Sequence, residues 1–489
     1  MSILEAAHAP AAAQDDALAI TELRAAFAAQ RTAFAADRNP ALEIRRERVA
    51  RIIPMMLGAR ERISAALASD FGAHPAPVSD LIEVLGVVGR AQYVLENLEA
   101  WMRPQPRPMD PGLFGTARAY VESQPKGVIG NIVPWNFPFD IGIGPMIEML
   151  AAGNRVILKP SEYAPACAAL LREMVAAHFE PELVYVAVGG VELARAFSDS
   201  PWDHLLYTGS PDVGRQVMAA AAKTLTPVTL ELGGKCPAVI LPGAVDAETV
   251  KTVIGTKIVK NGQMCVSVDY VLAPRAQMQR FAELSQAFMA EAAPDYANGP
   301  DCTGVISPRH LQRLEQMLQE ARSRHSQVIT LGDDTPADPA TRRMPMRLVL
   351  DPELDLRIMR EEIFGPILPV VPYDELEDAI AFINAGERPL GLYVMGHDAS
   401  QIDHVLASTS SGGAAVNACA VQGALPSLGF GGVGMSGMGR HHGVDGFREF
   451  SNQRGVVVRG QGDQIDAFFA PYAKAAAIVQ HVLTDAGAA

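Results

Sequence analysis

The sequence lacks the features of a membrane or exported protein. No apolar run reaches the roughly 18 residues that a membrane-spanning helix needs. The start, MSILEAAHAPAAAQDDALAI, lacks the basic residues and the apolar core of a signal peptide. Basic residues do not cluster, and 41 of them against 55 acidic residues give a net charge of −14, whereas a nucleic-acid partner requires a basic surface. We therefore expect a cytoplasmic protein with no stable membrane insertion and no nucleic-acid partner.

Cysteine is scarce, and metal-binding motifs are missing. Five cysteines in 489 residues are an odd number and do not predict a disulfide framework. There is no H-E-x-x-H segment and no cysteine pair at zinc spacing, so we expect no metal site. What is present is an ordinary globular composition, 49% hydrophobic and 20% charged, in a chain long enough for two or three domains.

The hydrophobic pattern changes along the chain. Residues 16–103 carry apolar groups at helical spacing. From GVIGNIV onward, short apolar strands alternate with helices that begin near residues 141, 161, 191 and 210. A second series runs from PAVILP to AAVNACA, with helices at 276–292 and 308–325. This alternation predicts two α/β units on parallel sheets, with ligands beyond the carboxyl ends of the strands and chemistry between the units.

Two segments that follow strands are candidates for binding a dinucleotide. In YTGSPDVG, Gly209 and Gly214 frame a turn, and Ser210 is placed to cap a helix whose N-terminus suits a phosphate. In KPSE, Lys159 and Glu162 are placed to hydrogen-bond the hydroxyls of a ribose. From the local sequence alone, a plain capped helix is an equally good interpretation of YTGSPDVG, and a solvated ion pair is the favoured interpretation of KPSE.

Three residue types suit catalysis by a thiol. Cys265 lies in the polar stretch GQMCVS, as a reactive thiolate requires, whereas the other four cysteines suggest inert core thiols. Glu231 ends a strand in LELGGK and is a candidate general base. Asn136 lies between two prolines in PWNFP, a stiff loop that suits an oxyanion donor. An ion-paired glutamate and a simple turn asparagine are the alternatives.

The late glycine cluster FGGVGMSGMGR contains a literal G-x-G-x-x-G at Gly432, Gly434 and Gly437. A cofactor fingerprint follows the first strand of a βαβ unit, but this stretch follows the second α/β series. We therefore do not expect it to bind the pyrophosphate. The adjacent His441 and His442 are expected at the surface or in an interface. The apolar spacing after residue 464 predicts a helix packed on the body or on a partner subunit, with peripheral membrane contact as the alternative.

Taken in order, PWNFP, LKPSE, YTGSPDVG, LELGGK, GQMCVS, EEIFGP and FGGVGMSGMGR resemble the aldehyde dehydrogenase superfamily, over about residues 120–455. The segments VAVGGVELARAFSDSPWDHLLYTGS and GRHHGVDGFREFSNQRGV are similar to its class 3-like branch. The resemblance implies an α/β fold with a Rossmann-like NAD-binding domain, a second α/β catalytic domain and a small β oligomerisation arm. It implies a helical N-terminus with the NAD-binding domain over 1–106 and 126–233, and a catalytic domain over 234–440. The arm covers 107–125 and 441–460, and a C-terminal helix or tail covers 461–489.

The resemblance also assigns roles to individual residues. Cys265 matches the nucleophile, Glu231 the general base, and Asn136 the side-chain donor to the oxyanion. The residues that match cofactor contacts are Trp135, Lys159, Glu162, Gly209, Ser210, Gly214, Glu362 and Phe364. An apolar substrate lining is expected from Phe137, Ile141 and Phe430.

The implied activity is NAD(P)-dependent oxidation of an aldehyde to the acid through a thiohemiacetal and a thioester on cysteine. The substrate expected from the resemblance is an aromatic or hydrophobic aldehyde such as coniferyl aldehyde. NAD is the first choice of cofactor, with NADP also in view, and the expected assembly is a homodimer. A CoA-acylating dehydrogenase and a non-catalytic binding protein on the same fold are the alternatives, and Glu231 favours hydrolysis of the thioester by water.

Overall fold

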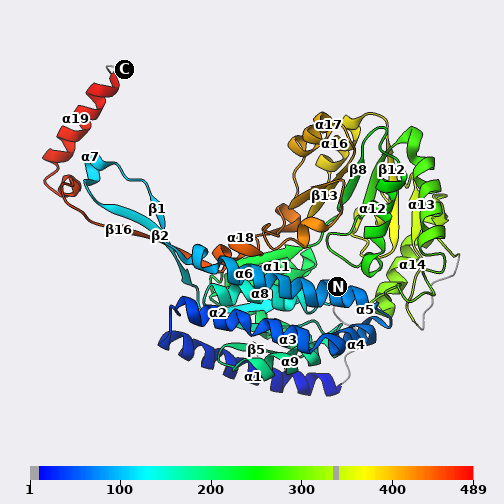
Figure 1. The fold of residues 1–489 in the computed structure, drawn as a ribbon, viewed down its shortest axis with the longest axis horizontal. Helices are drawn as coiled ribbons and strands as arrows, with labels where there is room; N and C mark the ends of the chain where they lie inside the picture. Colours follow the sequence, from blue (N-terminus) through cyan, green and yellow to red (C-terminus); the bar gives the residue numbers. More distant parts are fainter. Residues whose placement is uncertain (1–9, 334–340, 488–489) are drawn as a thin grey trace.

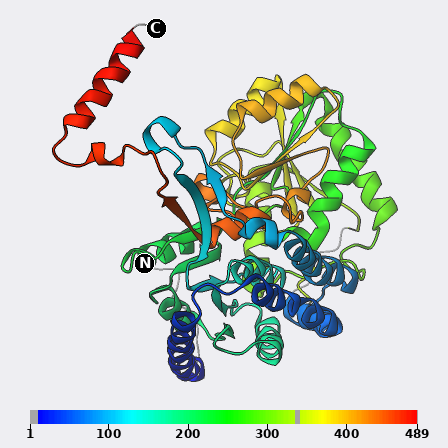
Figure 2. The same cartoon turned by 60° about the vertical axis from the view of Figure 1, so that its left-hand side comes forward.

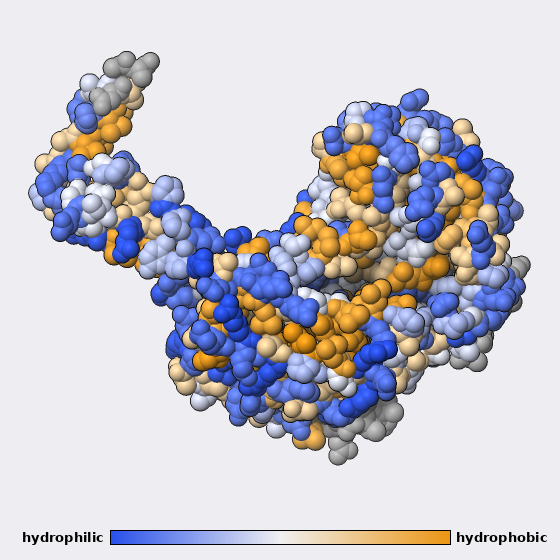
Figure 3. Space-filling model, in the orientation of Figure 1, coloured by the Kyte–Doolittle hydropathy of each residue, from blue (hydrophilic) through white to orange (hydrophobic). Residues whose placement is uncertain are grey.

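The computed structural model describes residues 10–333 and 341–487. Two large sheets form two bodies, and a small third sheet extends from them to the C-terminal segment (Figure 1). A hollow with apolar side chains on its walls separates the two bodies (Figure 3). This arrangement confirms the expected fold of two α/β units and a β arm.

The first body contains a six-stranded sheet of order β15-β7-β6-β3-β4-β5. Except for β15, all strands of this sheet run parallel to their neighbours. They are β3 (Val128–Ile132), β4 (Arg155–Lys159), β5 (Val184–Val186), β6 (His204–Gly209) and β7 (Val228–Leu232). The helices between them are α8 (Asp140–Ala151), α9 (Pro165–His178), α10 (Val191–Ser198) and α11 (Pro211–Ala222). Strands β3 and β4 are buried throughout, as strands covered on both faces should be.

Helices from the N-terminal part of the chain cover this sheet (Figures 1 and 2). They are α1 (Pro10–Ala36), α2 (Leu42–Ala50), α3 (Ile52–Gly58), α4 (Arg60–Phe71), α5 (Ala76–Val78), the π-helix η1 (Ser79–Gly86) and α6 (Val87–Met102). Gln30 fixes α1 to the sheet because its side chain donates to the carbonyl of Val156 at 3.1 Å. Two apolar clusters join these helices to the first sheet: one contains buried residues of α2, α3, α4, η1 and α6, and the other contains Leu23 and Ala26 of α1.

The second body contains a seven-stranded sheet of order β10-β11-β12-β9-β8-β13-β14. Its strands are β8 (Pro237–Ile240), β9 (Tyr270–Pro274), β10 (Gln327–Thr330), β11 (Arg347–Leu350), β12 (Ile367–Tyr373), β13 (Gly391–Met395) and β14 (Gly413–Val416). All neighbours are parallel except β10 and β11. The accompanying helices include α12 (Ala247–Ile258), α13 (Met278–Ala292), α14 (Pro308–Ser323), α15 (Arg357–Arg360), α16 (Leu376–Ala385) and α17 (Ala399–Ser408).

The third sheet joins segments that are far apart in the sequence. Strand β2 (Arg118–Pro125) pairs with β1 (Gln105–Arg107) on one side and with β16 (Ser451–Val458) on the other, both antiparallel. The short α7 (Pro111–Phe114) closes the turn between β1 and β2. The β-like segment at 117–125 therefore forms an arm, and its second partner comes from the end of the chain.

The C-terminal helix does not pack on the body, one of the two positions expected for it, and packing on a partner subunit stays a prediction. After η6 (Ile465–Phe468), helix α19 (Ala473–Gly487) stands apart from both large sheets in both views (Figures 1 and 2). Its apolar side chains, among them Val479, Val482 and Leu483, are exposed. Among the described residues, no helix is long and apolar enough to cross a membrane.

The late glycine cluster belongs to the edge of the first sheet. Strand β15 (Gly437–Met438) pairs antiparallel with β7, and Gly437 lies opposite Glu231. Gly437 has φ +142°, and a Cβ atom there would lie 2.1 Å from the carbonyl oxygen of Leu230. Glycine is therefore required here for close approach of two backbones.

Candidate active site

Cys265 follows α12 through an unusual turn. Lys260, Asn261 and Gly262 have φ values of 47°, 54° and 76°, so three successive residues are left-handed. Only glycine adopts this conformation without strain, so the surrounding contacts must hold the other two. The Asn261 side chain donates to the carbonyl of Met344 at 3.1 Å. A Cβ at Gly262 would lie 2.3 Å from the carbonyl oxygen of Gly365.

Of the five cysteines, all in the described part of the chain, only Cys265 is not fully buried. Burial, together with the nearby carboxylates of Glu362 and Glu231, raises the pKa of its thiol to about 12. The backbone N–H groups of Cys265 and Val266 act in the opposite direction and lower this pKa. The thiol thus lies among two carboxylates and two backbone donors.

Cys302 is a different kind of residue. It is completely buried in the core of the second body, where its sulfur contacts the side chain of Asn261 at 3.8 Å. Burial raises the pKa of this thiol to about 11. It packs as a small apolar side chain, which is the usual role of a buried free cysteine.

Asn136 is buried in the loop between β3 and α8. Its side-chain Nδ2 donates to the carbonyl of Gln263 at 3.3 Å, two residues before Cys265. The Gln263 side chain is itself fixed, because it donates to Lys260 and Gly304 carbonyls at 2.9 and 3.0 Å. The structure therefore brings the PWNFP loop and the cysteine loop together.

Glu231 lies near the carboxyl end of β7 and is 2% exposed. Within the described residues, both of its carboxylate oxygens are buried without a hydrogen-bond partner. Burial raises the pKa of Glu231 well above its ordinary value, Glu449 adds to this increase, and Arg440 opposes it. An unpaired buried carboxylate is costly, and a raised pKa of this kind is typical of functional sites.

Glu362 and Phe364 enter the same region from the second body. The Glu362 carboxylate lies against Gly233, where a Cβ atom would be 2.0 Å from Oε2. Burial and the charge of Asp269 raise the pKa of Glu362 to about 8, although the backbone N–H of Gly234 opposes this. Phe364 has φ 52°, and its ring meets Trp135 edge-on at 5.2 Å between centroids.

Four of the predicted cofactor residues lie at or just after the carboxyl ends of β4 and β6, the two parallel strands that flank β3. Lys159 ends β4 and its Nζ donates to Glu162 Oε2 at 2.8 Å. Gly209 ends β6, and Ser210 caps the 12-residue helix α11 by accepting from the N–H of Val213. An ion pair that can bind hydroxyls at the end of β4 and a helix N-terminus after β6 have the chemistry that suits a ribose and a pyrophosphate.

Gly214 has a packing role. It lies in the first turns of α11, and a Cβ atom there would be 2.8 Å from the Leu232 side chain. Its small size lets α11 approach β7 closely. This contact sets the position of the helix N-terminus beside the strand ends.

The three residues predicted to line the substrate site differ in burial and in their contacts. Phe137 is buried, and its ring centroid is 4.0 Å from the Lys260 ammonium. Ile141 is half-buried in the first turn of α8. Phe430 is half-buried and packs against the same core cluster as Cys265 and Val266.

His441 and His442 are not at the surface, and this expectation is wrong for the chain itself. They are 4% and 6% exposed, and their rings lie 5.2 and 5.5 Å from the Phe430 ring. Burial and the charge of Arg90 lower the pKa of both well below the ordinary value. Both are therefore neutral, and both rings pack against the ring of Phe430. The sequence carried no signal for this burial because Arg90 lies 351 residues before His441.

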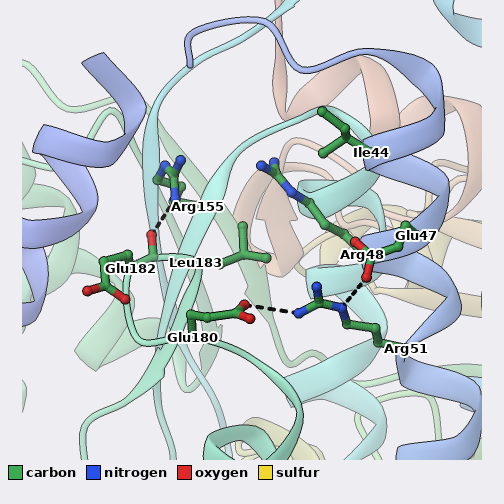
Figure 4. Close-up of a pocket in the computed structure, with 8 residues that line it drawn as sticks. All are labelled: Ile44, Glu47, Arg48, Arg51, Arg155, Glu180, Glu182 and Leu183. Carbon is green, nitrogen blue, oxygen red and sulfur yellow. Dashed lines mark hydrogen bonds and ion pairs between the residues drawn. The ribbon is translucent and has the colours of Figure 1, made fainter. Parts of the chain in front are cut away.

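A second pocket lies in the first body, and residues of α2 and the start of β4 are part of its lining (Figure 4). Arg51 pairs with Glu47 and Glu180 at 2.5 and 3.0 Å. Arg155 donates to the carbonyl of Glu182 at 2.6 Å. Within this lining, Arg51 pairs with two of the three glutamates and Arg155 donates to a backbone carbonyl, whereas the thiol and the buried carboxylates that suit catalysis lie at and around Cys265. No group of side chains suited to a metal ion occurs in the described parts of the chain.

The chain belongs to the aldehyde dehydrogenase family, whose model matches residues 6–456. Its relatives include the probable coniferyl aldehyde dehydrogenase of Caulobacter vibrioides, 41% identical over 87% of this chain and 89% of the relative. The coniferyl aldehyde dehydrogenase of Pseudomonas sp. is 37% identical and covers 97% of each chain. A family 3 member from Arabidopsis thaliana, member F1, is 35% identical over 90% of this chain and 91% of the relative.

Solved structures agree with the family. The substrate-bound state of Staphylococcus aureus AldH is 28% identical with a TM-score of 0.88, over 94% of this chain and 99% of that chain. The Mycobacterium tuberculosis aldehyde dehydrogenase complexed with NAD+ is also 28% identical, with a TM-score of 0.79 over 91% of each chain. The protein is an NAD(P)-dependent aldehyde dehydrogenase of the class 3-like branch.

Proposed function

We propose that Cys265 is the nucleophile of this enzyme, with Asn136 and Glu231 as its partners. The observation that carries the proposal is the position of Cys265: it is the one thiol that is not fully buried, and it lies between Glu231 and Glu362. The burial of the other four thiols, including Cys302, supports this choice. A nucleophile needs access to substrate, and Cys265 has it.

The reaction begins when the Cys265 thiol gives its proton to a solvent water and its sulfur bonds to the aldehyde carbon. The oxyanion that forms accepts hydrogen bonds from Asn136 Nδ2 and from the backbone N–H of Cys265. Donors fixed in advance are worth about 10²–10³ in rate each. The bound dinucleotide supplies the acceptor for the hydride that leaves when the oxyanion collapses. Cys265 then carries a thioester.

Glu231 completes the cycle. Its carboxylate takes a proton from water, the water oxygen bonds to the thioester carbon, and the Cys265 sulfur leaves as the acid forms. A raised pKa makes Glu231 a stronger base than an exposed glutamate. This function for Glu231 favours hydrolysis over transfer of the acyl group to CoA.

The cofactor residues follow the geometry of the strand ends. We assign Lys159 and Glu162 to the adenosine ribose, and Gly209 with Ser210 to the pyrophosphate at the α11 N-terminus. Glu362, Phe364 and Trp135 are assigned to the nicotinamide riboside. A carboxylate at Glu162 accepts from a 2′-hydroxyl and repels a 2′-phosphate, so we propose a preference for NAD over NADP.

For the substrate we propose an aromatic or hydrophobic aldehyde, with coniferyl aldehyde the first candidate because of the names of the bacterial relatives. Phe430, backed by two neutral histidines, supports an apolar wall. We further propose a homodimer joined through the β1-β2-β16 arm, and work in the cytoplasm, where the five free thiols stay reduced.

The test is Cys265→Ser, with Cys302→Ser as the matched control. Cys265→Ser should abolish NADH formation from aromatic and aliphatic aldehydes at 340 nm, while Cys302→Ser keeps most of the activity. Full activity of Cys265→Ser contradicts the mechanism. A panel of aldehydes measured with the wild type then ranks kcat/KM, and a clear preference for short aliphatic aldehydes contradicts the substrate proposal.

A further inference from the structure

Lys260 and Glu83 form a completely buried ion pair. Lys260 Nζ lies 2.6 Å from Glu83 Oε1, and the exposed fraction of both side chains is 0%. Lys260 belongs to the left-handed turn before Cys265, and Glu83 belongs to the π-helix η1, 177 residues earlier. Burying two charges is costly unless further hydrogen bonds compensate, so the other contacts of the pair indicate what it does.

Those contacts converge on one short loop. Lys260 Nζ donates to the backbone carbonyl of Asn136 at 2.5 Å. Glu83 Oε2 accepts from the N–H groups of Phe139 and Asp140, at 3.1 and 2.9 Å. The lysine therefore holds the loop at Asn136, and the glutamate holds it at the point where α8 begins.

The same loop contains the predicted oxyanion donor. Asn136 Nδ2 donates to the carbonyl of Gln263, and the side chain of Gln263 in turn donates to the carbonyl of Lys260 at 2.9 Å. Asn136 is thus fixed to the turn before Cys265 twice, once through its backbone oxygen and once through its amide. A shift of Lys260 changes the distance from this amide to the sulfur of Cys265.

We infer that Lys260 is a positioning residue for the oxyanion donor Asn136, with Glu83 as the counter-charge that holds the lysine in place. This inference rests on the proposed function of Asn136. Lys260 does not reach the substrate; it acts through the backbone of the loop. A misplacement of about 1 Å in such a group costs on the order of 10² in rate.

The main variant is Lys260→Met, which keeps the length of the side chain and removes both the charge and the donor. Its rate constant for the first burst of NADH should fall by about 10- to 100-fold, within the range for an impaired oxyanion donor. KM for NAD should stay within about 2-fold, because the cofactor residues do not contact Lys260. Single-turnover absorbance at 340 nm measures the burst.

A double variant separates positioning from a purely structural role. Lys260→Met leaves Glu83 as a buried unpaired charge, whereas Lys260→Met with Glu83→Gln is neutral and keeps an oxygen for the N–H groups of Phe139 and Asp140. Thermal stability should recover in the double variant, but the burst should stay slow because nothing donates to the Asn136 carbonyl. Recovery of both stability and burst rate overturns the inference.

A cycle with Asn136→Ala tests whether the effect passes through that residue. In the Asn136→Ala background, Lys260→Met should lower the burst rate by less than about 3-fold, since coupled residues give non-additive effects. Full additivity overturns the inference. Arg45→Met is the matched control, because buried Arg45 donates to the Ala151 and Ala152 carbonyls at the other end of α8. It should lower stability and leave the burst rate unchanged.

The proposed function of Asn136 and the positioning function of Lys260 are distinguished by different outcomes. An unchanged burst rate in Asn136→Ala alone contradicts the proposed function of Asn136, and the inference falls with it. A slow Asn136→Ala beside a fast Lys260→Met contradicts only the inference.

Discussion

The carboxylate of Glu362 lies against the backbone of Gly233, with Oε1 and Oε2 at 2.7 and 2.0 Å from the place where a Cβ atom would stand. Gly233 follows the strand that carries Glu231, and Glu362 comes from the second body. Gly233 therefore connects two proposed functional residues: it is two positions after Glu231, the proposed general base, and its backbone contacts Glu362, the proposed nicotinamide-riboside contact.

Gly233→Ala should displace the Glu362 carboxylate and impair binding of the cofactor. We expect KM for NAD to rise by at least about 10-fold, because a methyl group at this distance cannot be accommodated without movement of the carboxylate. Initial rates over a range of NAD concentrations measure this. Gly243→Ala is unsuitable as a control because Gly243 has φ +80°, so Gly255→Ala, which meets only the end of Phe288 at 3.9 Å, serves instead. An unchanged KM in Gly233→Ala would show that the contact is unimportant for the cofactor.

Glu231→Gln should keep the first burst of NADH and lose steady-state turnover by at least about 10²-fold, near the lower limit for loss of a general base. The amide cannot take a proton from water, but Cys265 can still be acylated. Stopped-flow absorbance measures both phases in one experiment. Unchanged turnover would remove Glu231 from the mechanism.

The stability of Glu231→Gln relative to the wild type should increase as the pH rises. Burial raises the pKa of Glu231 above its ordinary value of 4.5, so the folded protein binds this proton more tightly than the unfolded chain does. Stability from this proton is present below about pH 4.5 and is lost as pH rises through the folded pKa. The difference in melting temperature, Glu231→Gln minus wild type, should therefore increase as the pH rises above about 4.5. A difference that is constant with pH would contradict the raised pKa.

Glu162→Gln should relax the preference for NAD. Removing the negative charge ends repulsion of a 2′-phosphate, so the ratio of kcat/KM for NAD to that for NADP should fall by about 10-fold, or 1.4 kcal/mol. Steady-state kinetics with the two cofactors give the ratio for wild type and variant. A wild type that already prefers NADP would refute the charge argument before any substitution is made.

Deletion of residues 461–489 should leave the melting temperature of the body within about 2 °C, because α19 packs on η6 and stands apart from both large sheets. Scanning calorimetry measures this, and light scattering on the same sample gives the oligomeric state. A large loss of stability that accompanies a change to monomer would show that a second copy covers the exposed Val479, Val482 and Leu483.

Local patterns predicted the architecture well because it depends on features close in sequence. The alternation of strands and helices appears as two sheets, and the helix expected at 308–325 is α14 (Pro308–Ser323). Cys265, Glu231 and Asn136 were identified by type and by resemblance, and the structure brings the loops that carry them together. The division into domains and the roles of these residues stay predictions.

The errors concern contacts between distant segments. His441 and His442 have the composition of surface residues, but Arg90 and Phe430 enclose them. Lys260 gave no signal because its partner Glu83 is 177 residues away, and no spacing rule joins them.

The contact between Gly262 and Gly365 has a consequence for engineering. These two backbones are so close that the segment leading to Cys265 and the segment that carries Phe364 fit each other as a matched pair. If only one of the two segments is replaced by that of a relative, its backbone is no longer matched to the segment that remains. Chimeras intended to alter substrate choice should therefore transfer residues 259–266 and 358–366 together.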